Sequence, residues 1–312
     1  MPGAAIAVRE LRHTYAGVTA LDGITLDLPA GGFTALLGRN GAGKTTLVLA
    51  ICGLLRPAGG DVIVGGASTA DSPRAVRGQL GIVFQDPALD ARLTAWENLD
   101  FHARLYGVPR RERSARVRDA LATVGLADRA DARAGTLSRG LKRRLEIARA
   151  LTPAPRVLVL DEPTTGLDVQ SWYRIWACLD ALRARTGTTL LVTTHRIDEA
   201  EDADRVGVLD GGRLCALDTP DALRARSGGG ALRLTLTDSD AAAEAAARLP
   251  GVSRWSGVTL WLADGERGAV RAALLRDPAL WDRVTSLATA APSLEDAFLD
   301  LTGHEPGAAR DA

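Results

Sequence analysis

The fold of this chain is decided at Gly38-Arg39-Asn40-Gly41-Ala42-Gly43-Lys44-Thr45-Thr46, a glycine-rich stretch in the first fifty residues. It matches the phosphate-loop pattern, in which backbone N–H groups surround phosphates, a lysine reaches the β- and γ-phosphate oxygens, and a hydroxyl binds Mg²⁺. A buried strand is predicted before it over 33–37 and a helix after it over 45–54, whose positive end faces the anion. A glycine-rich turn without a ligand is the alternative, which this order of strand, loop and helix disfavours. We therefore expect these residues to bind a nucleotide.

Lys44 stands out because the chain uses arginine almost everywhere else for positive charge. The 38 basic residues include only two lysines, Lys44 and Lys142. A compact ammonium fits inside a ring of backbone amides, whereas the broad planar guanidinium of arginine does not. We therefore expect the chemistry of the loop to require lysine at position 44.

The composition limits the classes of protein to which the chain can belong. Its 312 residues suffice for one large domain or two smaller ones, and its 46% hydrophobic content is typical of globular proteins. Lys+Arg and Asp+Glu both total 38, so no overall basic field favours nucleic acid, and we expect no nucleic-acid partner. The basic runs at 110–118 and 142–144 are interpreted as solvated helix faces.

Cysteine usage and hydropathy indicate the compartment. Cys52, Cys178 and Cys215 have neither the spacing of a zinc site nor that of a disulfide framework, which fits a reducing cytosol. The sequence has no apolar run long enough to span a bilayer and no N-terminal signal pattern. We therefore expect a chain that is soluble by itself and is not secreted.

Hydrophobic periodicity predicts an α/β fold with an added antiparallel part. Residues 5–30 alternate apolar and polar side chains, as antiparallel strands do. From residue 33, buried strands such as 157–160 and 189–193 alternate with helices, which predicts a parallel sheet with crossover helices. The segment 90–150 is interpreted as a helical insertion in this P-loop NTPase core. Its expected helices are 95–105, 110–124 and 138–151.

A second domain is expected after a flexible linker. The small residues near 226–230 favour a boundary there, between a nucleotide-binding domain over 1–226 and a small α+β domain over 231–303. The pattern of the second domain is β-α-β-β-α-β, which is a ferredoxin-like arrangement. Its end predicts a capped helix that stops at Gly303, and residues 304–312 form a tail.

Two adjacent carboxylates, Asp161 and Glu162, end the hydrophobic strand that begins at residue 156. The strand is expected to place Asp161 beside the phosphate loop. A hard cation that is already bound by phosphate oxygens prefers further oxygen ligands. The alternative is a solvated acidic turn, which is common for one carboxylate but is disfavoured after a phosphate loop.

Together with the phosphate loop, these carboxylates and the further motifs described below resemble the ATPase subunit of an ABC transporter, over about residues 5–220. The resemblance implies ATP as the nucleotide and Mg²⁺ as the metal. Asp161 would hold Mg²⁺ through water, and Thr45 would bind it through its hydroxyl. Glu162 would be the general base that polarises the water attacking the γ-phosphate, and Lys44 would bind that phosphate.

The stretch Leu137-Ser138-Arg139-Gly140-Leu141 is similar to the family signature, usually written L-S-G-G-Q. The resemblance implies that Ser138 and the Gly140 amide act in trans, on the γ-phosphate held by a second subunit. The chain departs from the pattern at Arg139, which replaces the first glycine, and at Leu141, which replaces the glutamine. We expect a working site because Ser138 and Gly140 carry the key contacts. Read alone, Ser138 would be only a helix N-cap.

Four other residues match single positions of the family. Gln85 matches the glutamine that contacts Mg²⁺ and water and links the core to the helical insertion. His195 resembles the switch histidine that senses the γ-phosphate, and Asp168 resembles a loop residue that couples the two ATP sites of a dimer. Tyr15 matches the aromatic residue that stacks on adenine. Read alone, Gln85 would more often be a surface loop residue and His195 a structural histidine, and the alternative for Tyr15 is an ordinary strand aromatic.

The resemblance also implies partners. One phosphate loop and one signature cannot close their own site, so a second ATPase subunit is expected, in a homodimer or in a pair with a related ATPase. The energy would pass to a separate permease embedded in the membrane, with the chain peripheral at the cytoplasmic face. The expected docking segment follows Gln85 and includes Leu93, Trp96 and Leu99, although the same residues suit the core of the insertion equally well.

The direction of transport follows from a narrower resemblance. The segments 91–99, 142–146 and 292–298 look like those of bacterial drug-resistance and polysaccharide exporter ATPases, which implies export of a drug, lipid or polysaccharide. One alternative is a non-transport ABC ATPase acting on a nucleoprotein partner, which would need a second cassette or a long coiled-coil insertion. Another is a P-loop kinase outside the family, which would need an acceptor site. The sequence shows none of these features.

Overall fold

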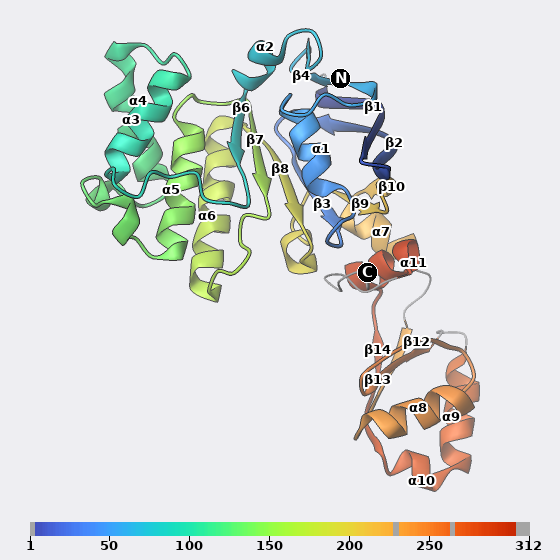
Figure 1. Cartoon of the computed structure of the whole chain (residues 1–312). Coiled ribbons are helices and arrows are strands. Elements are labelled where there is room, and N and C mark those ends of the chain that lie inside the picture. The colour runs from blue at the N-terminus through green and yellow to red at the C-terminus, as the bar shows by residue number, and fades with distance from the viewer. Residues whose placement is uncertain (1–3, 227–230, 263–265, 304–312) are drawn as a thin grey trace. The chain divides into compact units, whose positions relative to one another are not determined.

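The computed structural model describes residues 4–226, 231–262 and 266–303. Contacts divide the chain into two compact units, one reaching Pro220 and the other beginning at Asp221 (Figure 1). The predicted linker residues 227–230 and the predicted tail 304–312 lie outside the described residues.

A parallel sheet forms the centre of the first unit. Its six strands lie in the order β10-β9-β3-β8-β7-β6, and all neighbours are parallel except β10 and β9. Every residue of β3, β7 and β8 is buried, which explains their continuous apolar runs. The strands are β3 (Phe33–Gly38), β6 (Leu80–Val83), β7 (Val157–Asp161), β8 (Thr189–Thr194), β9 (Arg205–Asp210) and β10 (Arg213–Asp218).

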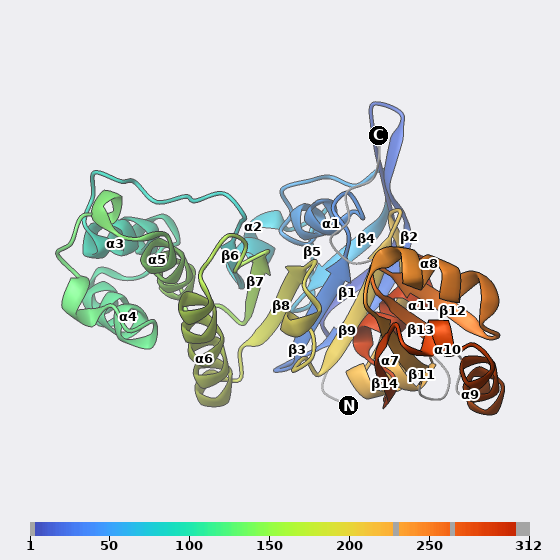
Figure 2. The same cartoon turned by 90° about the horizontal axis from the view of Figure 1, so that it is seen from below.

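An antiparallel sheet forms a second layer of this unit, as the alternation over residues 5–30 predicts. Its order is β2-β1-β4-β5, and helix α1 (Lys44–Ile51) packs between it and the parallel sheet, where side chains of both sheets and the helix share one core. Figure 2 shows the two sheets from below. The strands are β1 (Ala4–Tyr15), β2 (Val18–Pro29), β4 (Gly59–Val64) and β5 (Ala67–Ser68).

Helices α3, α4 and α5 form a separate helical part, which lies beyond the β6 edge of the parallel sheet (Figures 1 and 2). Their bounds agree closely with those expected, and Thr94 starts α3 with a capping box to Glu97. The remaining short helices of the unit are α2 and three 3₁₀ turns. The bounds are α2 (Pro73–Arg77), α3 (Ala95–Leu105), α4 (Arg110–Thr123), α5 (Arg139–Leu151), α6 (Val169–Thr186), and 3₁₀ turns at Ala127–Arg129, Ala134–Thr136 and Ile197–Glu199.

The second unit is a four-stranded antiparallel sheet with helices. Its strand order is β12-β13-β11-β14, and one apolar core joins the sheet to α8 and α9. Ser293 caps the last helix and Gly303 ends it with φ 70°, as the sequence predicts. The elements are α7 (Pro220–Arg226), β11 (Ala231–Leu236), α8 (Ser239–Arg248), β12 (Val252–Ser256), β13 (Thr259–Leu262), α9 (Arg267–Arg276), α10 (Pro278–Trp281), β14 (Val284–Ala290) and α11 (Leu294–Thr302). Among the described helices, none is both long and apolar enough to cross a membrane.

We predict that Gly60→Ala destabilises the first unit, because Gly60 faces an irregularity in β1. Its φ is +84°, and a Cβ there would lie 2.4 Å from the carbonyl oxygen of Arg9 and 2.5 Å from that of Glu10. The expected loss of unfolding free energy is about 1–3 kcal/mol. The neighbouring Gly59 is a matched control, because its Cβ would meet nothing closer than 3.9 Å. Urea unfolding should show a change within about 0.5 kcal/mol for Gly59→Ala, and equal losses for the two variants would contradict the argument.

Candidate active site

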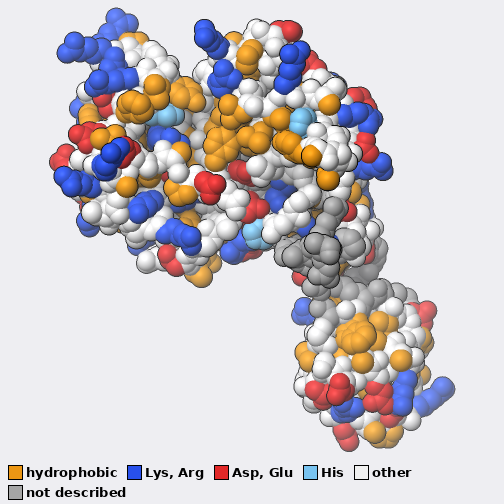
Figure 3. Space-filling model, in the orientation of Figure 1, with side chains coloured by type: hydrophobic (Ala, Val, Ile, Leu, Met, Phe, Trp, Pro, Cys, Tyr) orange, Lys and Arg blue, Asp and Glu red, His pale blue; other side chains and the backbone are white. Residues whose placement is uncertain are grey.

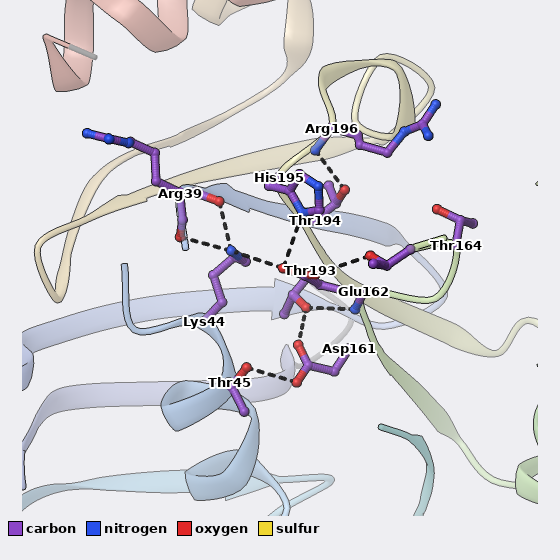
Figure 4. A network of polar contacts seen from close by, with 12 residues as sticks. Arg39, Lys44, Thr45, Asp161, Glu162, Thr164, Thr193, Thr194, His195 and Arg196 are labelled. Atoms are coloured by element: carbon purple, nitrogen blue, oxygen red, sulfur yellow. Dashed lines mark hydrogen bonds and ion pairs between the residues drawn. The ribbon is translucent and has the colours of Figure 1, made fainter. Parts of the chain in front are cut away.

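Part of the expected site converges at the carboxyl edge of the parallel sheet, where Figure 4 shows Lys44, Thr45, Asp161, Glu162 and His195. β3 leads into the phosphate loop, β7 ends at Asp161, and β8 leads to His195. β8 pairs in parallel with both β3 and β7, so the carboxyl ends of these strands lie at one edge. Open α/β sheets bind their ligands at such an edge.

Lys44 is held by the loop that precedes it. Its side chain is only 5% exposed, and its Nζ donates hydrogen bonds to the carbonyl oxygens of Gly38 at 2.8 Å and Arg39 at 3.0 Å. Burial lowers the pKa of the ammonium, and the carboxylate of Glu162 opposes that shift. The loop therefore holds a compact cation whose partners are mostly backbone oxygens.

The backbone of the loop requires glycine at position 43. Its φ of 101° lies in the left-handed region, and a Cβ there would lie 2.6 Å from the carbonyl oxygen of Ala20. Helix α1 begins at the next residue, so its first N–H groups point into the loop. Other parts of the loop face solvent, since Asn40, Gly41 and Thr45 are exposed. The geometry suits an anion that approaches from outside.

Asp161 is fixed by two hydroxyls from different segments. Thr45 Oγ1 donates to Asp161 Oδ2 at 3.0 Å, and Thr193 Oγ1 donates to Asp161 Oδ1. The carboxylate is almost completely buried, whereas the Thr45 residue is exposed. A hydroxyl and a carboxylate side by side are oxygen donors of the kind that Mg²⁺ prefers.

Glu162 lies between two basic side chains. Its Oε1 is 3.4 Å from Lys44 Nζ and 3.3 Å from His195 Nδ1, and Thr165 Oγ1 donates to its Oε2 at 3.2 Å. Burial tends to raise the pKa of this carboxyl, but the charge of Lys44 and the His195 ring outweigh it and lower the pKa below its ordinary value. The carboxylate is therefore ionised at neutral pH. His195 Nδ1 has no hydrogen-bond partner within the described part of the chain.

Gln85 and the signature residue Arg139 share a cavity of about 420 Å³ with Glu162. Gln85 follows β6, so the segment that enters the helical part opens onto the Glu162 carboxylate. Two further basic side chains line the same cavity, Lys142 and Arg143.

The signature begins helix α5. Ser138 is its N-cap, and Ser138 Oγ accepts a hydrogen bond from the Leu141 N–H at 3.4 Å. Gly140 packs against the first turn of α6, where a Cβ would lie 2.2 Å from Ser171 Oγ. Arg139 Nη1 donates to the carbonyl oxygen of Gly166 at 3.0 Å. The arginine that replaces a glycine thus ties the signature to the turn before α6.

Asp168 caps α6. It accepts hydrogen bonds from the N–H and the Oγ of Ser171, both at 2.8 Å, and these bonds hold the pKa of the Asp168 carboxyl below its ordinary value. Tyr15 ends β1, where its ring is partly exposed and contacts the His13 ring edge to face at a centroid distance of 4.5 Å. Neither residue contacts the Lys44–Glu162 group among the contacts described.

The expected docking segment is only partly at the surface. Leu99 is completely buried in the helical part, where α3 packs against α4 and α5, so of the two alternatives left open for it the structure supports a place in the core of the insertion. Leu93 lines a cavity of about 260 Å³ together with the exposed side chains of Phe101 and Leu105. Trp96 is partly buried.

Two residues at the site were not singled out by the sequence. Thr193 contacts both carboxylate residues, since its Oγ1 also accepts from the Glu162 N–H at 3.2 Å. Arg143 belongs to the run expected to be solvated, and that interpretation is wrong for this residue, which is 6% exposed. Helical spacing could have indicated that Arg143 is buried, because Arg143 lies three residues after Gly140 and four before Ile147, and both of these residues are buried.

Known proteins resemble this chain in sequence and structure. The family model described as "ABC transporter" matches residues 21–165. The chain is 39% identical to the daunorubicin/doxorubicin resistance ATP-binding protein DrrA of Streptomyces peucetius, over 97% of this chain and 94% of that protein. It is 37% identical to the Nod factor export ATP-binding protein I of Paraburkholderia xenovorans, over 98% and 99%.

A solved structure shows the same likeness. It is cbiO1 from Clostridium perfringens, part of the ABC transporter complex cbiONQ, with a TM-score of 0.66 and 31% identity over 80% of this chain and 96% of that one. Together with the phosphate loop, the paired carboxylates and the sheet that joins them, these likenesses place the chain in the family of ABC transporter ATP-binding proteins, as an ATPase that hydrolyses ATP for transport.

Proposed function

We propose that this chain powers the export of a drug-type or Nod-factor-type molecule through a separate membrane permease. The observation that carries the proposal is the Lys44–Glu162–Asp161 group, in a chain that is similar along nearly its whole length to drug-resistance and Nod factor export ATPases. The broader class of substrate is a drug, a lipid or a polysaccharide. Contacts with the substrate itself belong to the permease.

In the proposed site, Lys44 and the N–H groups of residues 38–46 bind the phosphates. Thr45, Asp161 and Gln85 hold Mg²⁺, which when bound would neutralise phosphate charge. Among the described residues there is no group of three His, Cys, Asp or Glu side chains suited to a metal, so phosphate and water oxygens complete this site.

Glu162 is the proposed general base. Its lowered pKa keeps it ionised, and the cavity beside Gln85 has room for water next to it. The carboxylate would orient the attacking water, while Lys44 and His195 stabilise charge on the γ-phosphate.

A second subunit completes the proposed site. The Ser138 hydroxyl accepts a hydrogen bond from the Leu141 N–H of its own helix, and no described hydrogen bond joins it to the phosphate loop, which fits a signature that acts on another subunit's nucleotide. We therefore propose a homodimer in which Ser138, Arg139 and Gly140 close over the partner's ATP. Asp168 would couple the two sites, and Tyr15 would stack on adenine through its exposed ring.

The permease is proposed to dock on the surface formed by Leu93, Phe101 and Leu105. Figure 3 shows hydrophobic side chains among basic ones over the helical part. Burial, helped by the charge of Arg149, lowers the pKa of His102 to about 4, so His102 is neutral at physiological pH, and the charged residues that line this cavity are Asp90 and Arg149. Docking there would hold the chain at the cytoplasmic face of the membrane. The second candidate, an ATPase acting on a nucleoprotein, is disfavoured by the balanced charge of the chain.

The second unit is proposed to be a ferredoxin-like domain. The strand order β12-β13-β11-β14 and the antiparallel pairing of all neighbours support this assignment. We retain 1–226 and 231–303 as the proposed domain bounds, with residues 304–312 as a tail.

Glu162→Gln should reduce ATP hydrolysis by at least about 100-fold, because the amide cannot accept the proton of water. ATP should also shift this variant from monomer to dimer on a sizing column. Asp128→Asn is the control, since that carboxylate is largely exposed and pairs only with Arg129 among the described contacts. A monomeric Glu162→Gln variant in ATP would exclude the homodimer, and a normal hydrolysis rate would exclude Glu162 as the base.

Asp161→Asn should weaken metal binding while it leaves the phosphate loop in place. We expect the Mg²⁺ concentration that gives half of the maximal rate to rise at least about tenfold, because an anionic ligand is lost. Titration of ATPase activity with Mg²⁺ after removal of metal by chelation measures this shift. An unchanged requirement for Mg²⁺ would show that Asp161 does not hold the metal.

Leu105→Asp should abolish the association with the permease, because it places a charge on the proposed docking surface. A tagged chain purified from detergent-solubilised membranes of the native host should carry an integral membrane protein, which the variant loses. Leu275→Asp is the control, since Leu275 is also helical and both leucines are 66% exposed. Recovery of only ribosomes or DNA with the unaltered chain would make the transporter proposal wrong.

A further inference from the structure

Arg143 is a buried cation in the helix that starts at the signature. Arg143 is 6% exposed, and its partner Glu146 is 2% exposed. Burial of such a pair costs desolvation energy, and well-packed apolar residues are often at least as stabilising. The pair is therefore poorly explained by stability alone, and its contacts point to another role.

One side of the guanidinium holds the turn that carries the catalytic carboxylates. Nε donates to the carbonyl oxygen of Pro163 at 2.7 Å, and Nη2 donates to those of Asp161 at 3.0 Å and Glu162 at 3.1 Å. Three consecutive carbonyls are thus bound by one rigid group. Lysine could not reproduce this pattern, because its ammonium has no planar fork.

The other side of the guanidinium holds the segment that contains Gln85. Nη1 donates to the carbonyl oxygen of Phe84 and to Glu146 Oε2, and Glu146 Oε1 accepts from the Ala88 N–H at 2.8 Å. The Arg143–Glu146 pair therefore binds the chain on both sides of Gln85.

The backbone of Glu162 needs such support. Its φ is +46°, a left-handed conformation that is unfavourable for a residue with a side chain and persists only where the surroundings hold it. The Glu162 N–H donates to the Thr193 carbonyl at 3.1 Å, and its carbonyl accepts from Arg143. Two segments thus fix the peptide groups on either side of the Glu162 side chain.

We propose that Arg143, with Glu146 as its anchor, is a positioning residue that holds Glu162 and Gln85 in the relative positions that hydrolysis requires. The proposal rests on the proposed role of Glu162 as the general base. Arg143 acts through the backbone of the turn and does not touch the nucleotide. Its loss should therefore change the rate of hydrolysis and leave the affinity for ATP almost unchanged.

The test compares Arg143→Lys and Arg143→Gln in the full-length chain, well below the unfolding temperature of each variant. We expect kcat to fall about 10- to 100-fold, as for small misplacements of a catalytic group. The KM for ATP, and the Kd for ATP measured in EDTA, should change less than about threefold, since Lys44 and its loop are untouched. Glu146→Gln tests the same contacts without changing Arg143 and should lower kcat in the same way.

Arg144→Lys is the matched control. Arg144 is the next residue of α5, and its Nη1 donates to the carbonyl oxygen of Val124 in the helical part. Its kcat should stay within about twofold of the unaltered chain. A normal kcat in Arg143→Lys would overturn the proposal, and so would a parallel loss of kcat and ATP affinity. A Glu162→Gln variant with normal hydrolysis would instead refute the role of Glu162 and overturn the proposal with it, whatever kcat Arg143→Lys shows.

Discussion

The parallel pairing of β8 with β3 on one side and β7 on the other is the constraint on which the site depends. The register sets Leu37 beside Thr194 and Asp161 beside Thr193. Side chains alternate between faces along a strand, so a shift of one residue would turn Thr193 away from Asp161. Close packing of the particular side chains that are buried on both faces of these strands opposes such a shift. The core of the sheet thereby determines the chemistry at its edge.

The charges at this edge offset one another within a few ångströms. The buried ammonium of Lys44 would be costly without partners, and the carbonyls of the loop and the carboxylate of Glu162 supply them. In the proposed reaction, phosphate oxygens replace the Glu162 carboxylate as the partner of the Lys44 ammonium. The carboxylate is then free to orient water, so that nucleotide binding and activation of the base are one rearrangement.

The sequence predicts what is contiguous in the chain and misses what depends on distant contacts. The phosphate loop and the strand that ends at Asp161 were predictable, because a short pattern and continuous apolar runs carry the signal. Thr193 reaches the site only through the pairing of β7 with β8. Charge patterning favoured a solvated Arg143, and it carries no information about which face of α5 meets the turn at 161–163. For the same reason the sequence left Leu99, on α3, open between a docking surface and the core.

The contacts between α5 and the turn at 161–166 use backbone oxygens, which makes them independent of the side chains in the turn. Arg143 binds the carbonyls of residues 161–163, and Arg139 binds that of Gly166. One helix therefore holds both ends of the turn, and that helix starts at Ser138. Because a helix and its close-packed surroundings move with little internal deformation, a displacement of the signature would reach Glu162 directly. The signature and the proposed base are therefore connected through α5 and its hydrogen bonds to the turn.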